Sequence, residues 1–136
     1  MSIYGIGIDL VEVERVTAAL EKHGEFWIQK IFTEREHAYC DAQHAPAIHY
    51  AARFAAKEAA AKALGTGIGK DAALQDLEIV NEDNGAPKLV LHGDAKDFAK
   101  GQGIAHVLIS LTHTKDYAVA NAVAELYYDP SPSQPS

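Results

Sequence analysis

The segment from Pro46 to Leu64 constrains the fold of this chain more than any other part of the sequence. It is dense in alanine, which has a high helix propensity, and Gly65 stands where a glycine commonly ends a helix. Its short side chains permit close packing on nearly every side. We therefore expect a long helix at the centre of a small domain.

Residues 3–11 predict a strand with two unlike faces. Aromatic and aliphatic side chains occupy the even positions, whereas Gly5, Gly7 and Asp9 share the opposite face. The two glycines leave the backbone of that face uncovered. The open space suits either a ligand or a tightly packed helix, and the sequence leaves both interpretations open.

The rest of the chain predicts helices first and strands afterwards, which is typical of an α+β domain. Two local signals are strong: the capping-box pattern from Thr33 to Glu36, and the Asn84-Gly85 turn between two apolar runs. The expected elements are a helix from about Glu12 to Gly24, a helix beginning at Thr33, strands at 77–80 and 88–91, a short helix at 94–99, and strands at 104–111 and 117–126. We expect one domain over residues 1–128 with an antiparallel sheet, followed by a flexible Pro/Ser-rich tail over 129–136.

Charge and composition exclude several classes of protein. The 136 residues carry 12 basic and 19 acidic side chains, a net charge of −7, which argues against nonspecific binding to nucleic acid. No apolar run reaches the roughly 18 residues of a membrane-spanning helix, and the N-terminus lacks the basic start of a secretory signal. Cys40 is the only cysteine, which excludes an internal disulfide and a cysteine-based zinc site. We expect a cytoplasmic protein that binds neither nucleic acid nor membranes.

Asp9 and Glu58 are the candidate metal ligands. Two carboxylates supply the hard oxygen donors that Mg²⁺ prefers, with waters and a substrate phosphate completing the coordination. The sequence alone does not bring the two together, and Asp9 also suits the N-cap of the following helix. Lys62 follows Glu58 at i+4 on one helix face, so a plain surface ion pair is the alternative for those two.

A glycine-rich loop and one histidine complete the candidates. Residues 65–69 follow a helix, whereas a Walker loop precedes one and carries Lys followed by Ser or Thr, so this is not a P-loop. The backbone amides of the loop are still suited to cradle a phosphate or a ribose. His113 stands between two threonines at a strand end, where a histidine is commonly structural or exposed.

Five sequence blocks occur in an order that resembles one enzyme family, and the resemblance covers about residues 3–126. The blocks are Gly5-Ile6-Gly7-Ile8-Asp9-Leu10-Val11-Glu12, Phe32-Thr33 with Glu36, Arg53-Phe54-Ala55-Ala56-Lys57-Glu58-Ala59 with Lys62-Ala63-Leu64-Gly65-Thr66-Gly67, Asn84-Gly85 with Pro87, and Ser110-Leu111-Thr112-His113-Thr114. The chain resembles the holo-acyl-carrier-protein synthase family of 4′-phosphopantetheinyl transferases. The resemblance implies transfer of phosphopantetheine from coenzyme A to a serine of an acyl carrier protein, with release of 3′,5′-ADP, in support of fatty acid biosynthesis.

The resemblance also implies roles for three of the candidates. Asp9 and Glu58 bind Mg²⁺, which holds the coenzyme A pyrophosphate, and Lys62 neutralises or protonates the leaving phosphate. Either Glu58 or a metal-bound water takes the proton from the attacking serine, and the sequence does not decide between them. Two metal-binding carboxylates and a lysine are the groups expected for phosphoryl transfer, because that reaction depends mostly on positioning and charge stabilisation.

The resemblance further implies a homotrimer whose coenzyme A sites lie between subunits. The residues expected at the nucleotide end of the cofactor are Arg53, Gly65, Thr66, Gly67, Thr112 and His113. The residues expected to face a neighbour's pocket are Asn84, Gly85 and Pro87. Residues 117–123, rich in valine and alanine, are the expected seam between subunits.

The carrier protein is expected to dock on the first helix. Arg15 matches an arginine of the family there, and Lys22 lies two turns further along the same face. The alternative is a solvated helix with internal ion pairs, because several glutamates surround these two residues. Lys30 and Arg35 are then the next candidates for docking.

Two other classes of function use the same residues. One is a different Mg²⁺-dependent phosphotransfer or hydrolytic enzyme, and the other is a non-catalytic module that binds a carrier or a nucleotide. Release of 3′,5′-ADP together with a gain of mass on the carrier separates the transferase from both. The presence of Asp9, Glu58 and Lys62 together speaks against the non-catalytic module.

Overall fold

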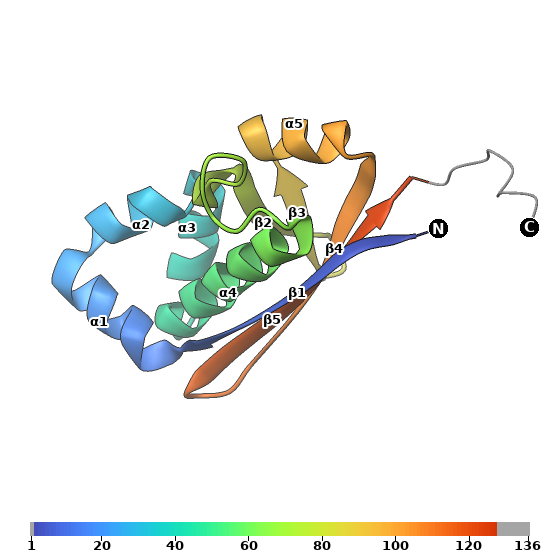
Figure 1. The fold of residues 1–136 in the computed structure, drawn as a ribbon. Helices are drawn as coiled ribbons and strands as arrows, with labels where there is room; N and C mark the ends of the chain where they lie inside the picture. The colour runs from blue at the N-terminus through green and yellow to red at the C-terminus, as the bar shows by residue number, and fades with distance from the viewer. Residues whose placement is uncertain (1, 128–136) are drawn as a thin grey trace, which may run out of the picture.

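The computed structural model describes residues 2–127, and Figure 1 shows how their helices and strands are arranged. The predicted tail, residues 129–136, lies outside the described residues. In chain order the elements are β1 (Ile3–Glu12), α1 (Val13–His23), α2 (Glu25–Ile31), α3 (Glu34–Asp41), α4 (Pro46–Leu64), a 3₁₀ turn (Leu74–Asp76), β2 (Leu77–Asn81), β3 (Pro87–Leu91), α5 (Gly93–Gly101), β4 (Ile104–His113) and β5 (Tyr117–Leu126). The expected α+β class, with most helices before most strands, is confirmed.

The strands form two antiparallel sheets where the sequence predicted one. In the larger sheet β5 lies between β1 and β4, and β2 pairs only with β3. Both predicted strand pairs, 77–80 with 88–91 and 104–111 with 117–126, are therefore present. They belong to different sheets. The sequence did not show this, because a hairpin pattern identifies a strand's partner in the hairpin but not its second neighbour.

Helix α4 is the central element. It lies across the larger sheet and also contacts α1, α3 and β2 (Figure 1). Its buried alanines are Ala51, Ala52, Ala55, Ala56, Ala59, Ala60, Ala61 and Ala63. They face further buried alanines of β5, at positions 118, 120, 122 and 124, so the helix and the sheet approach closely. Gly65 ends the helix with φ 80°, as the sequence predicted.

The glycine face of β1 is occupied by this helix. A Cβ atom on Gly7 would penetrate the carbonyl oxygen of Ala59, and one on Gly5 would penetrate that of Ala63. Of the two interpretations left open by the sequence, a ligand or a packed helix, the structure selects the helix. The backbone of β1 therefore lies directly on α4, which brings Asp9 beside the residues that α4 carries.

Helix α2 has no counterpart among the predicted elements. Gly24 ends α1 with a hydrogen bond from its N–H to the carbonyl of Leu20, and α2 begins at the next residue. The buried side chains of Ile28 and Ile31 join those of α1 in a second apolar cluster, with Trp27 packed at its edge. Only this tertiary packing supports so short a helix, which explains why local sequence patterns missed it.

A buried ion pair fixes the rotation of α4 about its own axis. The Lys57 Nζ lies 2.8 Å from Glu36 Oε1, and both side chains are fully buried. The ammonium also donates to the carbonyls of Leu74 and Leu77, so its three protons are all bonded. Burial lowers the pKa of Lys57, and the charge of Glu36 opposes that shift. Breaking such a buried pair typically costs about 3–5 kcal/mol, so it holds α4 firmly in register with β2.

The outer face of the larger sheet is apolar and uncovered. Its exposed large side chains include Ile6, Ile8, Leu10, Leu108 and Tyr117. Isolated exposed apolar residues are ordinary, but a contiguous set on one sheet face marks an interaction surface. Within residues 2–127, no helix is long and apolar enough to cross a membrane.

Candidate active site

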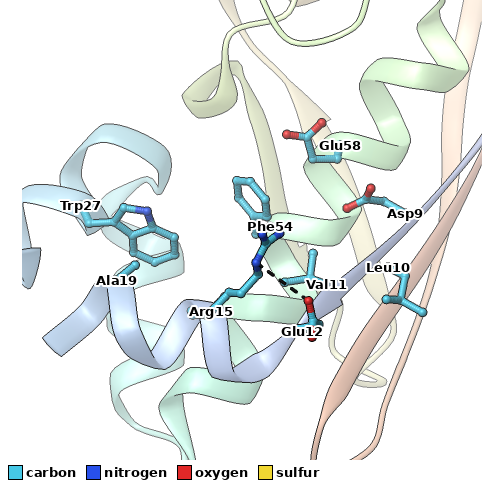
Figure 2. A pocket seen from close by; sticks show the side chains of 10 residues that line it. Asp9, Leu10, Val11, Glu12, Arg15, Ala19, Trp27, Phe54 and Glu58 are labelled. Atoms are coloured by element: carbon cyan, nitrogen blue, oxygen red, sulfur yellow. Dashed lines mark ion pairs between the residues drawn. The ribbon is translucent and has the colours of Figure 1, made fainter. Parts of the chain in front are cut away.

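Asp9 and Glu58 line one cavity of about 420 Å³, between β1, α1, α2 and α4. Figure 2 shows the two carboxylates close together, from β1 and from the middle of α4. Arg15, Trp27 and Phe54 form the other side of the cavity. The helix that follows β1 has Glu12 as its N-cap, so the interpretation of Asp9 as a helix cap is wrong. The structure therefore brings together the two candidate metal ligands.

Lys62 pairs with Asp9 and not with Glu58. Its Nζ lies 3.2 Å from Asp9 Oδ1 and donates to the carbonyl oxygen of Ile8 at 2.8 Å. No ion pair joins it to Glu58 among the described residues, so the i+4 surface pair suggested by the sequence is absent. The Lys62 side chain is half-exposed, whereas that of Asp9 is mostly covered, and Lys62 is not among the residues that line the cavity.

The electrostatics of the cavity favour a cation. Burial raises the pKa of Glu58, the nearby charge of Asp9 raises it further, and Lys62 partly opposes both effects. Because burial is the larger cause, the ionised carboxylate of Glu58 is poorly solvated here, and a nearby cation would stabilise it. Two carboxylates with a partly open cavity in front of them match the oxygen-rich, partly hydrated environment that Mg²⁺ requires. The residues present therefore fit the predicted metal.

The predicted nucleotide-binding residues fall into a second group. Arg53 is 3% exposed, donates to Asn81 Oδ1 at 2.5 Å, and stacks 3.9 Å from the centre of the Tyr39 ring. Arg53 precedes Glu58 by five residues, which places it about 140° away around the helix. Arg53 is not among the residues lining the Asp9–Glu58 cavity.

His113 also lies apart from the two carboxylates. It is exposed near the end of β4, with its ring 5.6 Å from that of His49 on α4. Thr112 precedes it and is likewise exposed. Sequence reasoning did not select Tyr39, His49 or Asn81, because nothing in their local pattern shows that α3, α4 and β2 meet here.

The loop after α4 differs from its predicted use. The N–H of Gly65 donates to the carbonyl of Lys62, and those of Thr66 and Gly67 donate to the carbonyl of Ala61. These three amides cap the helix in this structure, so contact between the loop and a cofactor stays a prediction. Gly65 and Gly67 both have positive φ and leave open space where a Cβ would lie, so the loop still admits a close ligand.

The predicted hairpin residues form an exposed turn. Asn84 Oδ1 accepts a hydrogen bond from the N–H of Ala86, and Gly85 has a φ of 86°. Pro87 begins β3 and pairs with Asn81. None of these residues lines the Asp9–Glu58 cavity, so within one chain they do not meet the carboxylates.

The predicted docking residues lie on the surface of α1. Arg15 lines the cavity and is 3.8 Å from Glu12 Oε1, with its side chain 83% exposed (Figure 2). Lys22 is exposed further along the same helix. Arg35, a fallback candidate, is bound instead to the buried carboxylate of Glu78 at 2.5 Å. The other fallback, Lys30, lies over the ring of Phe26.

Comparisons with known proteins identify the family of this chain. The sequence model of the 4′-phosphopantetheinyl transferase superfamily matches residues 5–122. A holo-[acyl-carrier-protein] synthase of Ruminiclostridium cellulolyticum is 46% identical over 89% of this chain and 91% of its own length. The crystal structure of the synthase from Neisseria meningitidis has a TM-score of 0.86 at 34% identity, covering 91% of this chain and 99% of that one.

Several solved relatives carry a ligand. The holo-(acyl-carrier-protein) synthase of Bacillus anthracis, in complex with coenzyme A (3′,5′-ADP), has a TM-score of 0.76 at 36% identity, covering 91% of this chain and 97% of that chain. The family model's range, residues 5–122, spans both carboxylates and Lys62. The chain belongs to the 4′-phosphopantetheinyl transferase superfamily, among its holo-[acyl-carrier-protein] synthases.

Proposed function

We propose that this chain transfers 4′-phosphopantetheine from coenzyme A to a serine of an apo acyl carrier protein in a Mg²⁺-dependent reaction. Asp9 and Glu58 share one cavity and Lys62 pairs with Asp9, and this arrangement carries the proposal. Phosphoryl transfer needs charge neutralisation and a proton acceptor, and these three side chains provide both. Asp9 and Glu58 are the residues that would hold the metal, which when bound offsets negative charge on the pyrophosphate.

The remaining chemistry belongs to side chains of the chain itself. The serine oxygen forms a bond to the β-phosphorus, and the bond from that phosphorus to the bridging oxygen breaks. Glu58, or a metal-bound water beside it, accepts the serine proton. Lys62, paired with Asp9, neutralises the charge that develops on the departing 3′,5′-ADP.

We further propose a homotrimer with active sites between subunits. The carboxylate group and the Arg53–His113 group lie on different sides of α4, so one copy alone does not surround a whole coenzyme A. The uncovered apolar face formed by Ile6, Ile8, Leu10, Leu108 and Tyr117 offers the surface for association. It includes the outer side of residues 117–123, the predicted seam. Light scattering should give about three times 14.7 kDa, and a fully active monomer would contradict shared sites.

The physiological role that we propose is activation of the carrier used in cytoplasmic fatty acid biosynthesis. The decisive test is the intact mass of an apo carrier protein incubated with coenzyme A, Mg²⁺ and this protein. Transfer produces a phosphopantetheine adduct on the carrier serine and an equal amount of 3′,5′-ADP. Release of 3′,5′-ADP without an adduct indicates a hydrolase, and binding without either product indicates a non-catalytic module.

A further inference from the structure

A histidine and two carboxylates converge between α2 and α3, and none of the three lines the Asp9–Glu58 cavity. Each side chain offers one ligand atom, and the three atoms lie within 4.8 Å of one another. His37 Nε2 is 3.3 Å from Glu25 Oε1 and 2.8 Å from Asp41 Oδ2. Glu25 begins α2, whereas His37 and Asp41 are four residues apart and share one face of α3. We call these residues the Glu25–His37–Asp41 cluster.

Negative charge exceeds positive charge in this cluster. Neither Glu25 nor Asp41 forms an ion pair with a lysine or an arginine in the described part of the chain, so His37 is their only basic partner there. A protonated imidazole carries one charge and offsets only one of the two carboxylates. A divalent metal ion offsets both and binds the imidazole in its neutral form. The charges of the cluster therefore suit a divalent metal ion better than a proton on His37.

The imidazole of His37 presents a nitrogen that no hydrogen bond uses. Its Nε2 is buried and has no hydrogen-bond partner among residues 2–127, although two carboxylate oxygens lie close to it. These oxygens are therefore near Nε2 but are not aligned with a proton on that atom. Buried polar atoms are normally bonded. A metal ion enclosed by the three side chains would engage the lone pair of Nε2 and one oxygen of each carboxylate.

The other oxygen of Asp41 is already held in place. Tyr50, which is fully buried, donates from its hydroxyl to Asp41 Oδ1 at 2.7 Å. Burial raises the pKa of Tyr50, and the hydrogen bond to Asp41 raises it further, so the phenol stays protonated and continues to donate. Oδ2 is then the oxygen that remains beside His37 Nε2. Hydrogen bonds of this kind orient the carboxylate ligands of metal sites.

The donor atoms and their separations indicate which metal fits. Imidazole combined with carboxylate is typical of Zn²⁺ sites, whereas Mg²⁺ and Ca²⁺ prefer oxygen donors alone. Bonds of about 2.0–2.1 Å in a tetrahedral zinc site place two ligand atoms about 3.3 Å apart, which is the separation of Glu25 Oε1 and His37 Nε2. Asp41 Oδ2 is closer to Nε2, at 2.8 Å, and has to move outward by about 0.5 Å on binding. Glu25 and His37 also line a cavity of about 450 Å³, which gives the ion and its water access.

We propose that Glu25, His37 and Asp41 bind one Zn²⁺ ion, with water as the fourth ligand. The ion would join the first residue of α2 to α3. Helix α2 is only seven residues long, and it carries Trp27, which lines the Asp9–Glu58 cavity. Bound Zn²⁺ would therefore stabilise α2 and one wall of the candidate active site. This inference goes beyond the proposed function and does not depend on it, because its test uses neither coenzyme A nor a carrier.

The test is calorimetric titration of the whole protein with ZnCl₂ in a buffer that contains millimolar Mg²⁺. We expect a saturable site for one Zn²⁺ per chain that Mg²⁺ does not displace. His37→Gln should weaken binding by at least about a hundredfold, because losing only an orienting partner already costs about 10–100-fold. Tyr50→Phe removes only the hydroxyl that orients Asp41 and should weaken binding by about tenfold. Zn²⁺ should also raise the melting temperature of the wild type but not that of His37→Gln.

Two control variants locate the ion. His106→Gln removes an exposed histidine that pairs with a single carboxylate, Glu125, and Asp9→Asn alters the candidate active site. Both should keep the Zn²⁺ affinity of the wild type. The proposal is overturned if the wild type has no saturable Zn²⁺ site, if Mg²⁺ displaces the ion, or if His37→Gln binds as the wild type does. Equal losses in His37→Gln and His106→Gln would also overturn it, since they would indicate binding by scattered histidines. If His37→Gln does not fold, the exposed change Glu25→Gln makes the same comparison.

Discussion

Lys62 Nζ lies 3.2 Å from Asp9 Oδ1, although 53 positions separate the two residues in the chain. The contact links the last turn of α4 to β1, and a second hydrogen bond to the carbonyl of Ile8 reinforces it. It leaves the carboxylate of Glu58 without a direct cationic partner in the described chain. The site therefore contains one compensated and one uncompensated carboxylate, which gives the two acids different chemical properties.

Removing the Lys62 ammonium separates its catalytic role from a structural one. We expect Lys62→Ala to lower kcat by at least about tenfold and to change the KM for coenzyme A much less, because its charge matters most as the leaving phosphate develops. The melting temperature should fall only slightly, since exposed pairs contribute about 1 kcal/mol or less. Normal turnover with a lowered melting temperature would reduce Lys62 to a simple ion-pair partner of Asp9.

Neutralising either carboxylate should abolish most of the activity. Asp9→Asn and Glu58→Gln are each expected to reduce turnover by at least roughly a hundredfold while the protein stays folded, because both changes are nearly isosteric. Steady-state kinetics across a range of Mg²⁺ concentrations provides the measurement. Glu14→Gln, an exposed change on α1, serves as the control and should behave as wild type. Full activity of Glu58→Gln would rule out the assigned metal and proton roles together.

Gly7 should not tolerate a side chain. A methyl group at Gly7 would overlap the carbonyl oxygen of Ala59, so Gly7→Ala must push β1 away from α4. We expect a loss of about 3 kcal/mol or more in the free energy of unfolding, measured by urea denaturation. Gly69→Ala is the control, because that position has open space and no positive φ. Equal stability of the two variants would mean that the helix and the strand are not packed this closely.

The buried carboxylate of Glu78 should make stability depend on acid pH. Burial alone would raise the pKa of Glu78, but hydrogen bonds from Arg35, Thr33 and His92 outweigh that effect and hold it at about 2. Its ordinary value is 4.5, so the folded state favours the ionised form. The resulting stabilisation, on the order of 2 kcal/mol, is complete above pH about 4.5 and is lost as the pH falls toward about 2.

Denaturant titrations of wild type and Glu78→Gln between pH about 6 and about 2 measure this contribution. The free energies of unfolding should differ most at the upper end and converge at the lower end. Glu82→Gln, an exposed change on the hairpin, should retain the wild-type profile. A constant difference between wild type and Glu78→Gln over the whole range would show that the ionisation of Glu78 has no such effect.

The carrier-docking surface can be tested by reversing one charge. Arg15→Glu should raise the KM for the acyl carrier protein strongly at low salt and leave the KM for coenzyme A unchanged. The difference should shrink as salt rises, because exposed charges are screened. The protein has a net charge of −7, so a local positive patch is needed to attract an acidic carrier. An unchanged carrier KM at low salt would move docking to Lys30, since Arg35 already binds Glu78.

Elements defined by local hydrogen bonding were predictable from the sequence. The capping box has both of its hydrogen bonds, from the Glu36 N–H to Thr33 Oγ1 and from the Thr33 N–H to Glu36 Oε1. The end of α4 at Gly65 and the turn at Asn84-Gly85 also lie where the sequence placed them. In each case the determining atoms are within a few residues of one another, so the pattern contains the necessary information.

Features that depend on packing between distant segments were not predictable from one sequence. In the sequence, Lys57 is not distinguishable from an ordinary surface lysine on an alanine-rich helix. Only the fold shows that its side chain is buried beside that of Glu36. The partner of Lys62 was misassigned for the same reason, because helix spacing favours Glu58 while the tertiary structure supplies Asp9. His49 had no distinguishing neighbours in the sequence, and its setting depends on β4 meeting α4.

The enclosure of α4 by small side chains also governs how the enzyme responds to heat. A helix that touches both sheets and two other helices has no room to fray while its surroundings stay folded. Glu58 and Lys62 therefore keep their spacing from Asp9 until the whole domain loses its structure. Within one subunit, we therefore expect the spacing of these side chains to be lost only when the domain unfolds, so their resistance to heat depends on the elements that enclose α4.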